Sequence, residues 1–194
     1  MPDRRRAILN APNLVTLLRI VLIPLIVGVF YLPDGWLPPD EKNLAATVIF
    51  IVAAVTDWLD GYLARKLDQM SAFGAFFDPV ADKLVVVGAL IILLYLNRVD
   101  MVVGLIIIGR EIAVSALREW MAQLGQARSV AVAFVGKLKT TLQMIAIPLL
   151  LYEDPLFGLV DCHGLGTVMI YVAAVLTVIS MLYYLRRALP LMRG

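Results

Sequence analysis

Cysteine and histidine are almost absent from this chain of 194 residues, which contains one of each, Cys162 and His163. A single cysteine excludes an intramolecular disulfide, and neither residue has the partners that a zinc or copper site needs. Charge is also scarce: Asp, Glu, Lys and Arg make up 16% of the residues, against about 25% in a soluble globular domain. The formal net charge of +2 is too small to indicate a nucleic-acid partner.

Apolar residues, in contrast, make up 61% of the chain, and its mean hydropathy is +0.88. A helix of about 20 mostly apolar residues crosses a bilayer, and helices are expected because lipid offers the backbone no hydrogen bonds. The segments that fit are 13–32, 43–63, 79–97, 101–120, 130–151 and 165–185. The sequence therefore predicts an all-α integral membrane protein with six transmembrane helices in a single domain, residues 1–194.

The first of these segments follows a basic stretch, residues 1–12, in the order that is typical of a signal peptide. Residues 13–32 form a long apolar stretch that carries Arg19 and is followed by no convincing small-residue cleavage site. We therefore expect a retained first span behind a cytoplasmic N-terminal segment.

Charge is distributed unevenly between the predicted loops. The loops 32–42, 97–100 and 152–164 hold seven acidic residues but only Lys42 and Arg98 as cations. The cations of the opposite side are Arg4, Arg5, Arg6, Arg65, Lys66, Arg118, Arg128, Lys137, Lys139, Arg186, Arg187 and Arg193. Because cytoplasmic loops are rich in Lys and Arg, both termini and the segment 56–83 are predicted to face the cytoplasm.

Four aspartates, Asp57, Asp60, Asp78 and Asp82, lie where two apolar segments meet that cytoplasmic side. Each ionised side chain at bilayer depth costs about 2.5–3.5 kcal/mol on insertion scales. Helical spacing puts Asp57 and Asp60 on one face of the second helix, and Asp78 and Asp82 on one face at the start of the third. Converging carboxylates would bind Mg²⁺, and four of them could hold two ions about 3.5–4 Å apart. The alternative is a solvated loop in which the aspartates form salt bridges with nearby Arg and Lys.

Small residues accompany the aspartates, since Gly61 and Ala64 share the face of Asp57 and Asp60. They would let a ligand approach, although a plain helix-packing face has the same composition. Arg65, one position beyond that face, could bind a phosphate through both guanidinium nitrogens.

The complete pattern, Asp57-x2-Asp60-Gly61-x2-Ala64-Arg65-x8-Gly74-x3-Asp78-x3-Asp82, resembles the signature of the CDP-alcohol phosphotransferases. The resemblance implies a six-helix membrane enzyme, usually a homodimer, that uses Mg²⁺ or Mn²⁺. It assigns the metal, two ions by our interpretation, to Asp57, Asp60 and Asp78. Asp82 becomes the general base and a further candidate ligand. The residues that it places at the CDP-diacylglycerol site are Asp57, Asp60, Gly61, Arg65 and Gly74.

Further polar residues bear on the acceptor alcohol. Asn13, Thr16 and Arg19 share one face of the first helix, and Arg110 and Arg118 share a face of the fourth. On the fifth helix, Lys137, Thr140, Thr141 and Met144 share a face that we expect to point inward, with Lys139 turned away. An inward cationic pocket suits an acceptor that itself carries phosphate, such as glycerol 3-phosphate or inositol phosphate. Snorkelling at helix ends would also explain Arg118, Lys137 and Lys139, and Glu111 would neutralise an arginine or simply balance charge.

The stretches around these residues resemble the bacterial family members that use glycerol 3-phosphate. We therefore predict a transferase of the bacterial inner membrane with its active site facing the cytoplasm. Its predicted partners are CDP-diacylglycerol, glycerol 3-phosphate and membrane lipids, with no nucleic acid. The residues predicted to bind glycerol 3-phosphate are Arg110, Arg118, Lys137, Arg19, Thr16 and Lys139. Two alternatives remain: a family enzyme with another acceptor, inositol phosphate or phosphatidylglycerol, and a cation transporter with an aspartate-lined path.

Overall fold

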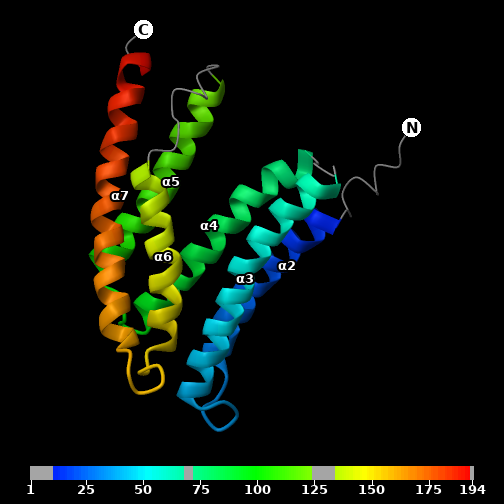
Figure 1. The fold of residues 1–194 in the computed structure, drawn as a ribbon, viewed down its shortest axis with the longest axis vertical. Coiled ribbons are helices and arrows are strands. Elements are labelled where there is room, and N and C mark those ends of the chain that lie inside the picture. Colours follow the sequence, from blue (N-terminus) through cyan, green and yellow to red (C-terminus); the bar gives the residue numbers. More distant parts are fainter. Residues whose placement is uncertain (1–10, 68–71, 124–133, 193–194) are drawn as a thin grey trace. The chain divides into compact units, whose positions relative to one another are not determined.

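The computed structural model describes residues 11–67, 72–123 and 134–192, and these ranges are helical apart from short connections and one isolated bridge. The helices are α2 (Ala11–Tyr31), α3 (Pro39–Leu67), α4 (Ala72–Tyr95), α5 (Met101–Gln123), α6 (Phe134–Tyr152) and α7 (Cys162–Met192) (Figure 1). The all-α prediction is confirmed for these residues, and each predicted segment corresponds to one helix. Most of the basic segment 1–12, and Arg128, lie outside the described residues.

Acidic residues of the three loops also start helices. Helix α3 begins at Pro39, with Asp40 and Glu41 in its first turn, where a fixed φ and negative charge are favourable. Asp100 caps α5 by accepting a hydrogen bond of 2.8 Å from the Val102 amide. Asp161 caps α7 in the same way, at 2.8 Å from the Gly164 amide. The acidic composition of these loops therefore also specifies where helices begin.

Helix α4 begins earlier than the sequence indicated. The apolar segment 79–97 led us to expect a start near residue 79, but α4 starts at Ala72 and continues through Pro79. Asp78 and Asp82 consequently lie inside the helix, one turn apart, and not at its start. The helix ends at Tyr95, and Asn97 follows with a φ of 56°, a left-handed conformation that asparagine tolerates better than most residues.

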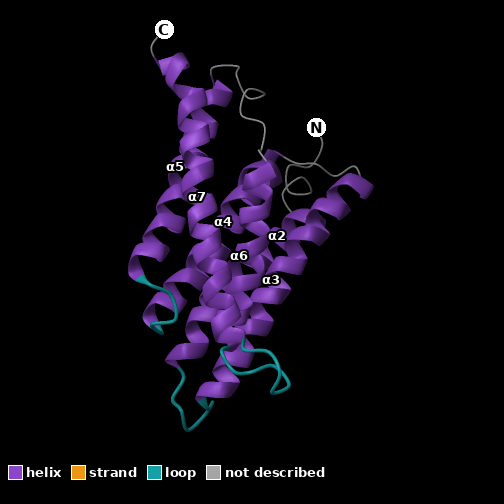
Figure 2. Cartoon of the chain, turned by 60° about the vertical axis from the view of Figure 1, so that its left-hand side comes forward, coloured by secondary structure: helices purple, strands orange, loops and turns teal. Residues whose placement is uncertain are grey.

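The chain divides into two compact units, and the first contains residues 1–93 and 151–154. Helices α2 and α3 pack along one another, as both ribbon views show (Figures 1 and 2). Helix α4 approaches α2 closely at Gly88, where an added Cβ would lie 3.0 Å from Cγ2 of Ile23. The buried apolar residues of this unit include Ile26, Val29, Ala46, Phe50, Ala53, Ala81, Val85, Ala89 and Leu90.

The second unit contains residues 94–150 and 155–194. Helix α5 packs against α7, and the cluster that joins them is Val114, Met121, Tyr184 and Ala188. Helix α6 meets α7 at Gly166, where an added Cβ would lie 2.8 Å from Cγ of the fully buried Leu150. The Arg98 guanidinium bonds the carbonyl oxygen of Leu150 at 3.1 Å, which ties the segment before α5 to α6.

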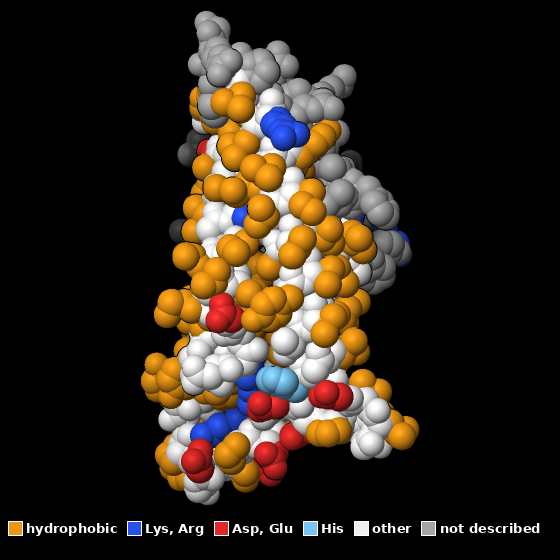
Figure 3. Space-filling model, turned by 90° about the vertical axis from the view of Figure 1, so that its left-hand side faces the viewer, with side chains coloured by type: hydrophobic (Ala, Val, Ile, Leu, Met, Phe, Trp, Pro, Cys, Tyr) orange, Lys and Arg blue, Asp and Glu red, His pale blue; other side chains and the backbone are white. Residues whose placement is uncertain are grey.

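Exposed apolar side chains run along several helices. On α2 they include Leu14, Leu18, Val21 and Leu25, which follow helical spacing. Apolar side chains also cover much of the face drawn in Figure 3, where acidic side chains gather toward one end. By length and composition, Leu14–Tyr31 and Cys162–Arg186 qualify as membrane spans within the part of the chain that the structure describes. These features support a membrane protein, whereas crossing by the other four helices stays a prediction.

The close approach at Gly166 predicts the effect of a one-carbon addition. Gly166→Ala should lower the free energy of unfolding by about 1–3 kcal/mol, because the new methyl group overpacks Leu150. Gly28→Ala is the matched control, since nothing lies within 4 Å of its added Cβ and alanine favours a helix by about 1 kcal/mol over glycine. In thermal unfolding in detergent, the Tm of Gly166→Ala should therefore fall and that of Gly28→Ala should rise. Equal shifts in Tm would contradict the close packing of Gly166 against Leu150.

Candidate active site

Arg19 lies at the centre of the aspartate cluster in the first unit. Its side chain on α2 is 1% exposed, and its Nη1 bonds Oδ1 of Asp57 on α3 at 3.1 Å and Oδ1 of Asp82 on α4. One turn earlier, the Thr16 hydroxyl donates to Oδ1 of Asp78 at 2.6 Å. Three of the four aspartates are therefore joined to one face of α2. The predicted shared face of Thr16 and Arg19 is confirmed, since both are buried.

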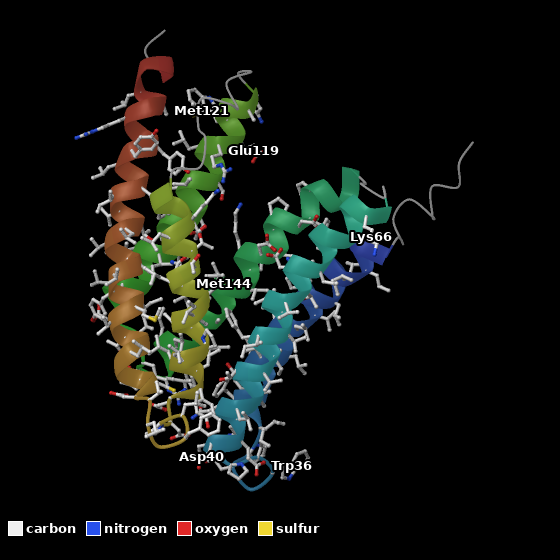
Figure 4. All side chains as sticks on the ribbon, viewed as in Figure 1. Trp36, Asp40, Lys66, Glu119, Met121 and Met144 are labelled. Carbon is white, nitrogen blue, oxygen red and sulfur yellow. The ribbon has the colours of Figure 1, made fainter. Side chains whose placement is uncertain are left out.

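The remaining motif residues also belong to these helices. Asp60, Gly61 and Arg65 lie in α3, but their side chains lie outside what the structure describes. Gly74 is buried in the first turn of α4. Figure 4 shows Lys66 near one end of α3 and Trp36 and Asp40 at the opposite end, so the motif belongs to the Lys66 end. That arrangement agrees with the charge separation on which the predicted orientation rests.

The chemistry of this donor set fits a hard divalent cation. Carboxylate oxygens are the ligands that Mg²⁺ prefers, and Asp57 and Asp82 keep 48% and 45% of their side chains exposed. A cation and substrate phosphates can therefore approach them from solvent. Among the described residues, no three acidic, histidine or cysteine side chains are grouped closely enough to form a metal site by themselves.

The second unit contains a separate group of polar side chains between its helices. Arg110 on α5 bonds Oε1 of its neighbour Glu111 at 3.1 Å and the Ser180 hydroxyl on α7 at 3.2 Å. Lys139 on α6 donates to the same Oε1 of Glu111. The side chains of Lys139 and Glu111 are 2% and 17% exposed, so the pair is largely withdrawn from solvent. This group links all three helices of the unit.

The helical phase that we predicted for α6 was wrong. Lys137, Thr140 and Thr141 are exposed, whereas Lys139, which we expected to turn away, is buried. The buried face of α6 comprises Gly136, Lys139, Gln143, Ala146, Ile147 and Leu150. Apolar residues at the spacing of Ala146, Ile147 and Leu150 indicate that face in the sequence, but lipid-facing positions are equally apolar.

The remaining predicted cation of α5, Arg118, is exposed, although Val114 one turn before it is buried. Sequence reasoning left the role of Glu111 open and passed over Ser180, the two residues that hold Arg110. An acidic residue beside an arginine in an apolar helix is a signal for Glu111. Ser180 in the apolar seventh segment offers no comparable signal, because a serine there also suits close helix packing.

Comparison with known proteins adds an independent observation. Residues 9–179 match the CDP-alcohol phosphatidyltransferase family. A protein of Escherichia coli (strain K12) is 49% identical over 181 residues, which cover 92% of this chain and 94% of the relative. A protein of Shigella flexneri serotype 5b (strain 8401) matches with the same identity and coverage. Both relatives are named CDP-diacylglycerol–glycerol-3-phosphate 3-phosphatidyltransferase.

The position of Arg19 predicts how the aspartate cluster responds to metal. In Arg19→Met the carboxylates of Asp57 and Asp82 lose their shared cation and repel each other. The variant should unfold at a lower temperature in EDTA, and Mg²⁺ should raise its Tm by more than it raises that of the unaltered protein. Thermal unfolding in detergent with and without Mg²⁺ measures both effects.

Lys42→Met is the matched control for this experiment. It removes another ion pair of the same unit, Lys42 to Asp34 at 2.6 Å, which belongs to the opposite end of α3. Mg²⁺ should raise the Tm of Lys42→Met by as much as it raises that of the unaltered protein. An equal response in Arg19→Met would mean that Arg19 does not neutralise the carboxylates that bind metal.

Proposed function

The chain belongs to the CDP-alcohol phosphatidyltransferase family, and we propose that it transfers the phosphatidyl group of CDP-diacylglycerol to glycerol 3-phosphate. The products are phosphatidylglycerophosphate and CMP. The observation that carries the proposal is the 49% identity, over nearly the whole chain, to relatives named for this reaction. The names of these relatives favour glycerol 3-phosphate over inositol phosphate or phosphatidylglycerol, and membership of a transferase family argues against a cation transporter.

The donor site is the aspartate cluster of the first unit. The family generally depends on a divalent metal, and Asp57, Asp60 and Asp78, with Asp82, are the residues that would hold it, as Mg²⁺ or Mn²⁺ and as two ions. Bound metal would neutralise the pyrophosphate and the leaving CMP. Gly61 and Gly74 would leave room for the nucleotide, and Arg65 would pair with a phosphate.

Asp82 is the proposed general base. It takes the proton from the 1-hydroxyl of glycerol 3-phosphate as that oxygen attacks the phosphorus carrying diacylglycerol. The new P–O bond replaces the bond to the CMP phosphate, and the electron pair leaves with CMP. Support comes from the exposed part of the Asp82 carboxylate and from its fixed position against Arg19. A positioned base of this kind contributes about 10²–10⁴-fold to the rate.

The acceptor phosphate is proposed to bind Arg110, Arg118 and Lys137. Arg118 and Lys137 are exposed, as residues that meet a soluble substrate should be, and Arg110 is held firmly by its neighbours. Thr16, Arg19 and Lys139 were predicted for the same role. Each already donates to a carboxylate, so we propose that their main effect is on that carboxylate.

The proposed setting is the bacterial inner membrane, with both termini and the aspartate cluster on the cytoplasmic side. Lys66 and the aspartate motif lie toward one end of α3, and Trp36 and Asp40 lie at the other (Figure 4). This distribution supports the orientation, because Lys-rich ends face the cytoplasm and aromatic residues are enriched at interfaces. A homodimer is proposed from the family resemblance.

Purified protein in detergent provides the direct test of the reaction. With CDP-diacylglycerol, Mg²⁺ and glycerol 3-phosphate it should release CMP and form phosphatidylglycerophosphate, and EDTA should abolish both products. Inositol phosphate and phosphatidylglycerol in place of glycerol 3-phosphate should release little CMP. Release of CMP with either of them at a rate equal to that with glycerol 3-phosphate would contradict the proposed acceptor.

Replacement of the general base should affect turnover more than donor binding. In Asp82→Asn the shape is kept and the proton acceptor is lost, so kcat should fall by about 100-fold or more, while the KM for CDP-diacylglycerol changes little. Asp40→Asn is the control, because Asp40 is exposed in the first turn of α3, at the end away from the motif (Figure 4). Near-normal turnover of Asp82→Asn would leave Asp82 as a ligand or a structural charge only.

A further inference from the structure

Glu111 occupies an unusual position among the polar residues of the second unit. One of its carboxylate oxygens accepts hydrogen bonds from two cations, Arg110 on its own helix and Lys139 on α6. The side chains of Arg110, Glu111 and Lys139 are 10%, 17% and 2% exposed. All three are therefore largely shielded from the water that would otherwise stabilise their charges.

Burial of these charges destabilises the fold unless they are paired, since removing one unpaired ion from water costs several kcal/mol. Two cations share one carboxylate, so the group retains one positive charge. Lys139 is the more deeply buried of the two cations, and its side chain pairs with Glu111. Arg110 is bonded from two sides, and it is the cation that a bound anion could reach more readily.

Arg110 is held in one orientation by contacts from two helices. Nη1 bonds Glu111, Nη2 bonds the Ser180 hydroxyl at 3.2 Å, and the guanidinium carbon lies 5.8 Å from the centre of the Tyr184 ring. Its Nε is buried and has no hydrogen-bond partner within the part of the chain that the structure describes. A long side chain fixed in this way loses little further conformational entropy when it binds an anion.

In the described part of the chain, polar atoms without hydrogen-bond partners also lie one helical turn from Lys139 on α6 and from Ser180 on α7. Nε2 of Gln143 and Oγ1 of Thr177 are buried without a hydrogen-bond partner among the described residues. Gln143 follows Lys139 by one turn of α6, and Thr177 precedes Ser180 by one turn of α7. Buried polar atoms without partners are rare in proteins and call for a ligand or water. The polar side chains between α5, α6 and α7 therefore resemble a binding site more than a core in which every buried polar atom has a partner.

We propose that Glu111 is a positioning residue of the acceptor site: it neutralises Lys139 and, with Ser180, orients Arg110 toward the phosphate of glycerol 3-phosphate. This inference rests on the proposed function, since it needs Arg110 to bind the acceptor. In this arrangement Lys139 holds the carboxylate of Glu111 and does not bind the substrate. The competing explanation is that Glu111 only balances the charge of Lys139.

The variant that separates these explanations is Glu111→Gln combined with Lys139→Met. It removes one negative and one positive charge, so the net charge of the group is unchanged and no buried lysine is left without its carboxylate. Arg110 is then the one cation that has lost the carboxylate of Glu111. Lys139→Met alone and Glu111→Gln alone complete a double-mutant cycle. Glu119→Gln is the control, because Glu119 is exposed on the same helix (Figure 4). Each variant is assayed in detergent with Mg²⁺ for the KM of both substrates, for kcat and for Tm.

If Glu111 positions Arg110, the double variant should raise the KM for glycerol 3-phosphate by about 10- to 100-fold, the usual value of one charge-assisted hydrogen bond. The KM for CDP-diacylglycerol should stay within about twofold, and Lys139→Met alone should have the smaller effect. Should Glu111→Gln alone fail to fold, the double variant still decides the question.

Three results would overturn the inference. A normal KM for glycerol 3-phosphate in the double variant would make Glu111 a counter-charge only. An equal increase in Lys139→Met alone would make Lys139 a substrate ligand. An equal increase in both KM values would indicate a general loss of structure. Arg110→Ala separates this inference from the proposed function: if it leaves the KM for glycerol 3-phosphate unchanged, the proposed acceptor site itself is wrong.

Discussion

One guanidinium, that of Arg19, bonds carboxylates from two other helices, and the arrangement of the aspartate cluster depends on it. Asp57 and Asp82 lie on α3 and α4, and both accept a hydrogen bond from the same nitrogen of Arg19. Without that shared cation the carboxylates would repel each other beside apolar helices, where ionised groups are costly. The bond also gives α2, an otherwise apolar helix, a direct part in the geometry of the proposed base.

The two units carry opposite excesses of charge, and each excess suits a different part of the proposed reaction. In the first unit, Asp57 and Asp82 share one guanidinium and Asp78 accepts from a neutral hydroxyl, which leaves negative charge for a divalent metal to neutralise. In the second unit, two cations share the carboxylate of Glu111, which leaves positive charge for a phosphate. In both units a charged hydrogen bond between helices stabilises the packing and fixes a group that the chemistry would use. The proposed chemistry would therefore depend on contacts that also join the helices.

Local patterns were enough to predict much of this protein. Apolar segments of about 20 residues predicted the helices, because backbone hydrogen bonding in lipid leaves few other structures. The spacing of the aspartates predicted a carboxylate cluster, because residues three or four apart share a helix face, and the structure bonds Asp57, Asp78 and Asp82 to α2. The same rule placed Thr16 and Arg19 together, as the structure confirms. The start of α4 was predicted less well, because the length of an apolar segment does not show how far the helix extends into the polar stretch before it.

The sequence by itself thus determined the helices, the family and the aspartate motif proposed for the donor chemistry, since all three are encoded in short-range spacing. The tertiary structure decided which cations are buried and which carboxylate each one meets. Lys139 and not Lys137 faces its neighbours, and Glu111 joins Arg110 to Lys139. Periodicity could not distinguish these alternatives, because in a membrane protein the lipid-facing and protein-facing sides of a helix are both apolar. Only the packing of α5, α6 and α7 assigns each polar side chain its partner.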